Sequence, residues 1–107
     1  NYVMTYTVIA SRRVDSMLLK HISFLAKVSL PAARRFRNDY STVLKRISDN
    51  PFQFPIEADL NLPEGIYRKA LFSKRYKAIF WVEKSTVYLD AVVDCRQNFD
   101  EEMERHS

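Results

Sequence analysis

The sequence predicts an α+β domain with the element order β-α-α-β-β-β. Two observations carry this prediction. Apolar residues recur at three- and four-residue spacing through residues 14–47, which is the period of amphipathic helices. After Gly65 the pattern changes to strand-like runs separated by short connections. Because the helices precede the strands instead of alternating with them, we expect a helical hairpin packed on one face of an antiparallel sheet.

The N-terminal half is expected to form one strand and two helices. Residues 2–10 are rich in Tyr, Val, Thr and Ile and contain no Gly or Pro, which favours a strand. Ser11 can cap a helix that reaches about Lys27, and Pro31 suits the first turn of a second helix. The second helix is expected to end just before Pro51, because a proline disfavours helical geometry in the residue that precedes it. A link of about four residues predicts an antiparallel hairpin.

The C-terminal half is expected to form a loop and a meander. The prolines of residues 51–63 predict a loop that presses apolar side chains onto the core. Three strands follow at 66–72, 76–82 and 86–93, and connections of about three residues make them antiparallel neighbours. In the last strand one face is expected to be buried and the other wet. The buried set would be Val87, Leu89, Ala91 and Val93, alternating with Tyr88, Asp90, Val92 and Asp94.

Length and composition exclude several classes of protein. The 107 residues suit one domain, 1–107, whose last part, 97–107, reads as an acidic tail. A single glycine leaves no phosphate-cradling G-x-G-x-x-G loop, and a single cysteine excludes an intramolecular disulfide. We therefore predict no cofactor and no metal. Because no apolar run approaches the roughly 20 residues that span a bilayer, we expect no membrane partner. The single cysteine favours a reducing compartment, the cytoplasm.

The net charge of +4 conceals a segregation along the chain. Residues 1–50 carry +6 and residues 66–96 carry +4, whereas 51–65 and 97–107 each carry −3. A basic body of this kind suits an anionic partner, either a nucleic acid or an acidic protein face. A charge that only keeps the protein soluble explains the same count.

Basic and aromatic residues gather on the three C-terminal strands. They are Arg68, Lys69, Lys74, Arg75, Lys77 and Arg96, interleaved with Tyr67, Tyr76 and Trp81. Strand alternation places Lys77 opposite Tyr76, and places Arg96 with Asp90 and Asp94 if the strand extends that far. Such a face suits phosphates or an acidic partner, and the aromatic rings could stack on bases. Pairing of these cations with Asp90 and Asp94, and packing of the rings in the core, are the alternatives.

Two potential nucleophiles or bases are better explained by packing. His21 lies at the edge of the first helical stripe, and we expect a packed or surface residue. Cys95 ends the last strand, and we expect a small buried residue instead of a catalytic thiol. No His, Cys or carboxylate cluster suggests a metal site.

The ordered features resemble the ParE/RelE superfamily of toxins from type II toxin–antitoxin modules. The resemblance covers nearly the whole chain, because its pieces keep their order and spacing. These pieces are Tyr6-Thr-Val-Ile, Ala32-Ala33-x-x-Phe36, Ile47-Ser-Asp-Asn-Pro51, Gly65-Ile-Tyr67-Arg68, Arg75-Tyr76-Lys77-Ala-Ile-Phe80 and Val92-Val-Asp94-Cys95-Arg96. The resemblance implies a small basic bacterial toxin that an antitoxin binds and neutralises in a hetero-oligomer.

The superfamily has two branches, and the resemblance implies a different target for each. RelE-like toxins cut mRNA on the ribosome with basic strand residues and, in many members, a Tyr or His near the C-terminus. ParE-like toxins poison DNA gyrase through protein contacts. Arg68, Lys77 and Arg96 match basic positions of the superfamily, but Gln97 to Glu102 contain no Tyr or His, and RNA cleavage needs a proton acceptor and donor.

We therefore favour the ParE branch, as a gyrase inhibitor that is not an enzyme. The target-binding residues are predicted to be Arg68, Lys77 and Arg96 with Tyr67 and Tyr76. If the protein is instead an mRNA endonuclease, Arg68, Lys77 and Arg96 would stabilise the transition-state phosphate. A protein of the same fold that binds a partner without toxicity is the third possibility.

Overall fold

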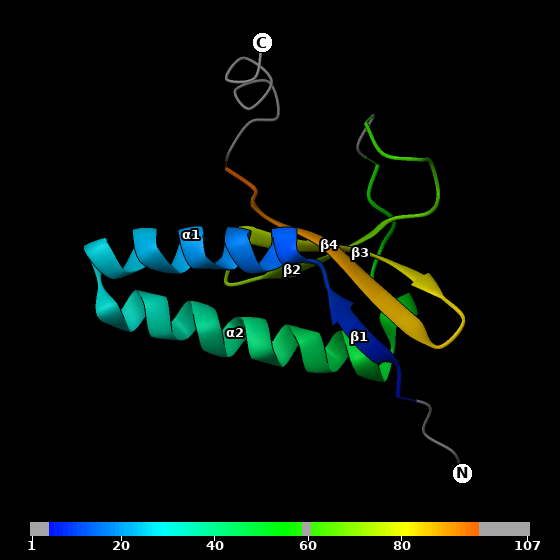
Figure 1. The fold of residues 1–107 in the computed structure, drawn as a ribbon, viewed down its shortest axis with the longest axis horizontal. Coiled ribbons are helices and arrows are strands. Elements are labelled where there is room, and N and C mark those ends of the chain that lie inside the picture. Colours follow the sequence, from blue (N-terminus) through cyan, green and yellow to red (C-terminus); the bar gives the residue numbers. More distant parts are fainter. Residues whose placement is uncertain (1–4, 59–60, 97–107) are drawn as a thin grey trace.

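The computed structural model describes residues 5–58 and 61–96, and it has the α+β architecture that the sequence predicts (Figure 1). The predicted acidic tail, 97–107, and the first part of the predicted N-terminal strand lie outside the described residues. The elements are β1 Thr7–Ala10, α1 Arg12–Val28, α2 Leu30–Asp49, the 3-10 helix η1 Pro51–Gln53, β2 Arg68–Phe72, β3 Tyr76–Glu83 and β4 Thr86–Asp94. The last three strands begin or end within two residues of the expected positions.

The two helices begin and end at residues whose side chains or backbone satisfy the helix termini. The Ser11 hydroxyl accepts a hydrogen bond from the Val14 N–H at 3.3 Å, and Asn50 ends α2 directly before Pro51. The expected link of about four residues between the helices is wrong, because Ser29 alone connects them. Its extended backbone reverses the chain, its N–H donates to the Leu25 carbonyl, and its hydroxyl accepts from the Ala32 N–H. One residue thus completes both helix ends.

The sheet has the strand order β1-β4-β3-β2, and β2, β3 and β4 form the predicted antiparallel meander. The sheet as a whole is mixed, because β1 pairs with β4 in parallel, so the expectation of an antiparallel sheet is wrong for this one pair. A tight hairpin can join only antiparallel strands, whereas the connection from β1 to the meander contains both helices and leaves the direction free. Strand periodicity alone therefore does not predict how β1 pairs.

A β-bulge in β4 changes which side chains face the helices. Ile79 pairs with Ala91 but Phe80 pairs with Leu89, so Asp90 is an extra residue on β4. The predicted burial is therefore correct at Val87, Leu89 and Ala91. It is wrong at Val92, which joins the main core, and at Val93, which is only half-buried. The same shift gives Asp94 the face of Val92, so Asp90 and Asp94 do not share a face.

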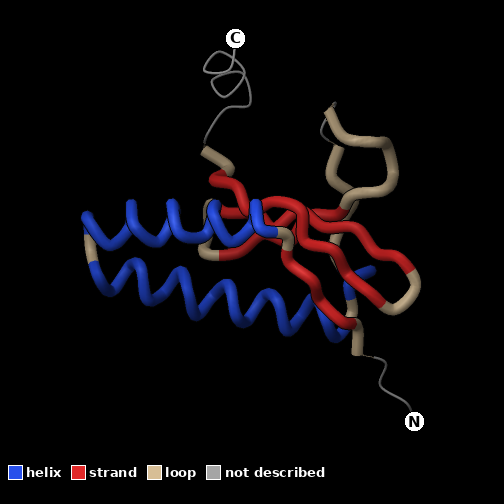
Figure 2. Tube along the Cα trace, in the orientation of Figure 1, coloured by secondary structure: helices blue, strands red, loops and turns tan. Residues whose placement is uncertain are grey.

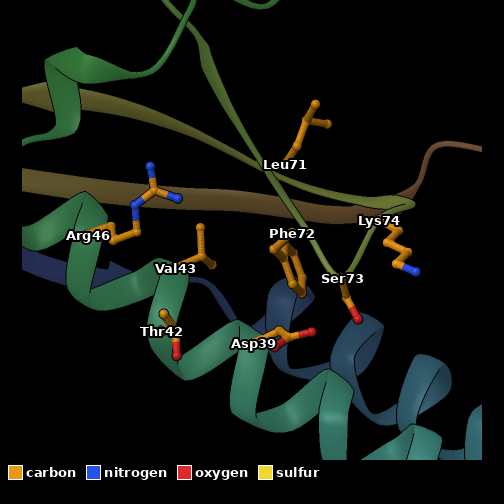
Figure 3. Close-up of a pocket in the computed structure, with 8 residues that line it drawn as sticks. All are labelled: Asp39, Thr42, Val43, Arg46, Leu71, Phe72, Ser73 and Lys74. Carbon is orange, nitrogen blue, oxygen red and sulfur yellow. The ribbon is translucent and has the colours of Figure 1, made fainter.

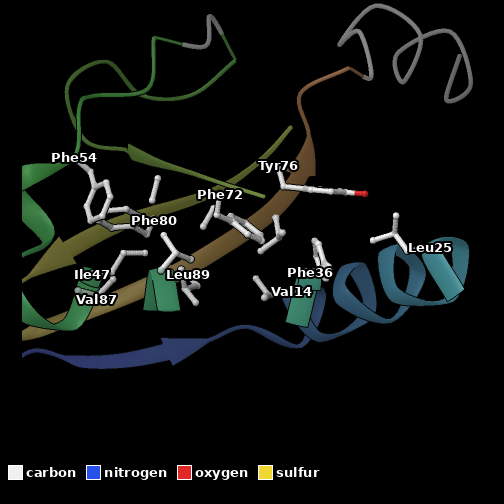
Figure 4. Packing of buried hydrophobic residues seen from close by; sticks show 14 of the residues in the cluster. Val14, Leu25, Phe36, Ile47, Phe54, Phe72, Tyr76, Phe80, Val87 and Leu89 are labelled. Carbon is white, nitrogen blue, oxygen red and sulfur yellow. The ribbon is translucent and has the colours of Figure 1, made fainter. Parts of the chain in front are cut away.

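The two helices pack against one face of the sheet, and the main core lies between the helices and the sheet (Figure 4). Side chains that are less than 2% exposed include Val14, Phe36 and Ile47 from the helices and Phe80 and Leu89 from the strands. The end of the helical hairpin projects beyond the strands (Figures 1 and 2). Within the described ranges, neither helix combines the length and apolar character that crossing a membrane requires.

Candidate functional site

Tyr76 lies in the core and not on an open surface. It is 2% exposed, and its ring lies edge-on to Phe36 and to His21, with centroids 4.7 and 5.0 Å away. His21 Nε2 lies 2.8 Å from the Val92 carbonyl oxygen, so His21 has the packed role that we expected. Figure 4 shows the Tyr76 ring extending toward Leu25 of α1. The Tyr76 ring therefore offers a partner almost no accessible surface.

Lys77 points to the opposite side of β3, as strand alternation predicts, and there it forms an ion pair. Its Nζ donates to Glu57 Oε2 at 2.7 Å, and the two side chains are 22% and 6% exposed. Glu57 is held in place by its backbone, whose N–H donates to the Tyr67 carbonyl at 2.8 Å. The short segment around Ile56 thus forms a bridge beside β2 and brings a carboxylate to Lys77.

Arg68 holds the same segment from the other face of β2. Its Nη1 donates to the Phe54 carbonyl at 2.7 Å, and its guanidinium lies over the Phe52 ring, 5.1 Å from the centroid. Arg68 pairs in register with Phe80, whose side chain is in the core. Tyr67 and Arg68 are both half-buried. This cation therefore anchors the chain between η1 and β2.

Arg96 follows the last strand and pairs with Asp94. The guanidinium donates to both carboxylate oxygens, Nη2 to Oδ2 at 3.0 Å and Nε to Oδ1 at 3.3 Å. Burial alone would raise the pKa of Asp94, but the hydrogen bonds from Arg96 and the charges of Arg96 and Arg75 outweigh it and hold this pKa below its ordinary value. The Arg96 side chain is 55% exposed, so a partner can still contact it.

Cys95 is exposed, so the expectation of a small buried residue is wrong. β4 ends at Asp94, and the Cys95 N–H donates to the Arg75 carbonyl, which leaves the side chain outside the core. Partial burial still raises the pKa of the thiol, against an opposing effect of Lys77. A raised pKa disfavours the thiolate, and this agrees with the expectation that Cys95 is not an activated nucleophile.

The structure brings some of the predicted site residues together and separates others. Lys77 pairs in register with Val93, and Lys69, Lys77 and Asp94 all act on the pKa of the Cys95 thiol. Lys77 and the end of β4 therefore lie close together. Arg68 lies toward the opposite end of β2, beside η1, and Tyr76 lies beneath the sheet. Within the part of the chain described, no group of His, Cys, Asp and Glu could hold a metal ion.

Two features of this region were not expected from the sequence. Glu57 lies in the loop that we expected to carry apolar contacts. The signal in the sequence is limited to its negative charge in an acidic segment that precedes the basic strands. Trp81 and Tyr88, which could have been separate stacking platforms, stack on each other with centroids 4.4 Å apart and an interplanar angle of 19°. The ion pair of Glu57 with Lys77 and the stack of Trp81 on Tyr88 both depend on how strands and loops pair in the fold.

A groove of about 290 Å³ lies between α2 and the turn that joins β2 to β3 (Figure 3). In Figure 3, Phe72 and Val43 point toward one another across its floor, whereas Leu71 points away from the helix. The lining residues are Asp39, Thr42, Val43, Arg46, Leu71, Phe72, Ser73 and Lys74. Their mixture of charges and apolar side chains does not single out one ligand class.

Comparison with known proteins supports the fold. The chain is similar in structure to a chain of the chromosomal ParDE TA system from P. aeruginosa, with a TM-score of 0.69 and 13% sequence identity. The alignment covers 85% of this chain and 97% of that chain. No protein-family model and no curated protein sequence matches the chain. The likeness at this identity establishes a shared fold.

Proposed function

We propose that this protein is the toxin of a type II toxin–antitoxin system and that a cognate antitoxin neutralises it in a hetero-oligomer. The observation that carries the proposal is the likeness to a chain of a ParDE TA system over 85% of this chain and 97% of that one. The same fold was expected from the order of sequence features alone. Fold does not determine function by itself, and the target depends on the residues that the fold displays.

The pairing of Lys77 and Arg96 with carboxylates favours a target that is bound through protein contacts, and we propose that this target is DNA gyrase. An mRNA endonuclease needs a base for the 2′-hydroxyl and free cations for the phosphate. Here Lys77 and Arg96 already pair with carboxylates, and Tyr76 and His21 are packed against each other. Charge pairs with one exposed partner suit a protein interface, where they set orientation and association rate.

We place the target contact at the end of β4, where Arg96 follows the strand and Lys77 lies on the neighbouring strand β3. Arg96 is the most accessible member, and Lys77 and Arg68 hold the adjacent loop in position. Tyr67 continues this surface beyond β2, whereas the contribution of Tyr76 is limited to supporting the strand on which Lys77 lies. The mechanism is inhibition by binding.

The decisive experiment adds the purified protein to a gyrase supercoiling reaction and, separately, to translating ribosomes. Loss of supercoiling with stabilised DNA breaks supports the proposal, whereas codon-positioned mRNA cuts without an effect on gyrase would replace it with the endonuclease function. Inactivity in both reactions, together with tight binding to an acidic protein encoded next to this one, would indicate a partner-binding protein without toxicity.

The role of Arg96 is tested with Arg96→Ala, which should abolish growth arrest while the protein stays folded. Lys45→Ala is a matched control, because Lys45 is an exposed cation on α2, away from the strands. The double variant Arg96→Ala with Asp94→Asn removes the carboxylate that the single change leaves without its partner. Growth arrest that persists in a folded Arg96→Ala protein would show that the contact surface lies elsewhere.

A further inference from the structure

The last part of β4 lacks the second strand neighbour that its first part has. β1 pairs with β4 as far as Ala10 opposite Leu89, because Ser11 then caps α1 and the chain leaves the sheet. From Ala91 to Asp94, the strand that pairs with β4 in the described part of the chain is β3. Backbone groups of this stretch that point away from β3 therefore need partners other than a strand.

The Val92 carbonyl is one of these groups. The Cys95 N–H donates to the carbonyl of Arg75, the residue before β3. In an antiparallel pair, the backbone groups of alternate residues face the neighbouring strand or face away from it. Those of Val93 therefore face β3, and those of Val92 face the side on which β1 has ended. Because Val92 is completely buried, a carbonyl without a partner would be costly there.

His21 of α1 contacts this carbonyl. Its Nε2 lies 2.8 Å from the Val92 oxygen, and a carbonyl only accepts, so the tautomer with a proton on Nε2 forms this bond. The imidazole ring packs against Phe36 of α2 and Tyr76 of β3, with centroids 5.9 and 5.0 Å away. This packing fixes the direction of the donor. His21 thus supplies at Val92 the hydrogen bond that β1 supplies to the first part of β4.

The residues that follow Val92 carry the predicted contact. Asp94 lies on the same face as Val92, is 9% exposed and ends β4. Its carboxylate accepts three hydrogen bonds from Arg96, one from the backbone N–H at 2.9 Å and two from the guanidinium at 3.0 and 3.3 Å. The position of Arg96 therefore depends on Asp94. The position of Asp94 depends in turn on a strand end whose open side is bonded to His21.

We propose that His21 is a positioning residue for Arg96, because its hydrogen bond to Val92 holds the end of β4 and so sets where Arg96 meets the target. The inference rests on the proposed function for the identity of the target. The contacts that lead from His21 to Arg96 are the same whatever Arg96 binds. A side chain that only filled space could be replaced by Phe, whereas a positioning residue needs the donor.

Two substitutions separate the donor from the ring. His21→Phe keeps an aromatic ring beside Phe36 and Tyr76 and removes the donor, and His21→Leu takes its place if that protein does not fold. His21→Gln loses the ring and keeps an amide donor at a similar distance from the backbone. Tyr40→Leu is the matched control, because it removes a half-buried ring of α2 that packs against Phe72 and leaves the end of β4 untouched.

Two NMR measurements follow the end of β4 without any target. In the original chain the pKa of the Asp94 carboxyl lies below its ordinary value, and in His21→Phe a ¹³C-detected titration should show it rising toward about 3.9. The Arg96 amide should exchange with solvent about tenfold faster in His21→Phe, the change that the loss of one hydrogen bond produces. His21→Gln and Tyr40→Leu should match the original chain in both measurements.

The gyrase supercoiling reaction then tests what the position of Arg96 serves. His21→Phe should need about ten times more protein for half inhibition, whereas His21→Gln should stay within about threefold of the original chain. Unchanged inhibition by a His21→Phe protein in which the Asp94 titration and the Arg96 exchange have both changed would overturn the link to the target.

Three further results would overturn the positioning role itself. One is an Asp94 titration and an Arg96 exchange rate that His21→Phe leaves unchanged. Another is a folded His21→Gln protein that does not restore them. The third is an equal change in Tyr40→Leu, which would assign the effect to lower stability. If the original chain leaves gyrase unaffected, the proposed function fails, and the two NMR measurements still decide the role of His21.

Discussion

At the scale of single residues, the ion pair between Lys77 and Glu57 is both a structural contact and part of the proposed target surface. The Glu57 side chain is 6% exposed, so removing only Lys77 leaves a nearly buried charge without a partner. Lys77→Met should lower the free energy of unfolding by about 2 kcal/mol, which is below the range for fully buried pairs because Lys77 is 22% exposed. Urea denaturation measures this loss.

A double-mutant cycle separates the interaction between Lys77 and Glu57 from the effect of changing each residue alone. Glu57→Gln together with Lys77→Met removes both charges, and this variant should recover part of the stability that Lys77→Met loses. Strictly additive losses would contradict a direct interaction. If the double variant is stable yet causes no growth arrest, the loss of activity belongs to the removed charges and not to a damaged fold.

The carboxylate of Asp94 makes stability depend on pH in a defined direction. Its pKa in the folded protein lies below the unfolded value of about 3.9, so the folded state favours the charged form. The contribution of this group is therefore present above about pH 4 and is lost as the pH falls through the folded pKa. In urea unfolding, the advantage of the original chain over Asp94→Asn should shrink steadily as the pH falls below 4.

The exposure of Arg96 determines how much the Asp94 pair contributes to stability. Arg96 is 55% exposed, so solvent screens the pair, and its loss should cost less than the loss of the more buried Lys77 pair. Asp39→Asn serves as a control, because Asp39 is exposed and forms neither of the two ion pairs of the described residues. An advantage over Asp94→Asn that stays constant down to pH 2 would show that its charge plays no part in stability.

At the scale of elements, Ser29 is a single residue on which both helices depend. Its N–H donates to Leu25 at 2.8 Å and its hydroxyl accepts from the Ala32 N–H at 3.3 Å. Ser29→Ala removes only the second contact and should cost about 1 kcal/mol of stability, as the loss of other helix N-caps does. Ser23→Ala is the matched control, because Ser23 is exposed within α1, where Ala is the better helix former.

Chemical denaturation of the two serine variants tests this role. Ser29→Asp retains a side-chain acceptor at the cap and should recover most of the stability that Ser29→Ala loses. Equal stability of the Ser23→Ala and Ser29→Ala proteins would contradict a capping role for the linker residue.

The elements themselves could be predicted because their signals are local. Apolar spacing, Ser11 as a cap and Pro51 as a stop define the helices from neighbouring residues alone. The parallel pairing of β1 with β4 and the bulge at Asp90 could not be predicted, because both depend on how distant segments align. The length of the link between the helices was overestimated, because Val28 and Leu30 were expected to belong to the link. Both residues instead have helical geometry, on either side of Ser29.

The candidate site was predictable in its residue types and not in their environment. The sequence places basic and aromatic residues on three strands, but it does not show which of them are already bonded. The Tyr76 side chain is packed in the core, and the Arg68 guanidinium already donates to the Phe54 carbonyl. Glu57 lies 20 residues from Lys77, and only the folded loop brings the two side chains together.

At the scale of the whole molecule, the hairpin end and the sheet differ in how they are supported. β3 is paired on both sides, by β2 and β4, and its Ala78 and Phe80 are completely buried. The hairpin end projects beyond the strands and relies on contacts between the two helices (Figure 2). Segments with less tertiary support open at lower free energy than the global unfolding reaction. The two regions should therefore differ in their local stability.

Native-state hydrogen exchange measures this difference residue by residue. The slowest amides should belong to the central part of β3 and to the paired residues of β4, with protection equal to the global free energy of unfolding. Amides at residues 22–36 should exchange through a smaller opening, by at least about 1 kcal/mol. Equal protection in both regions would show that the hairpin end unfolds only with the sheet.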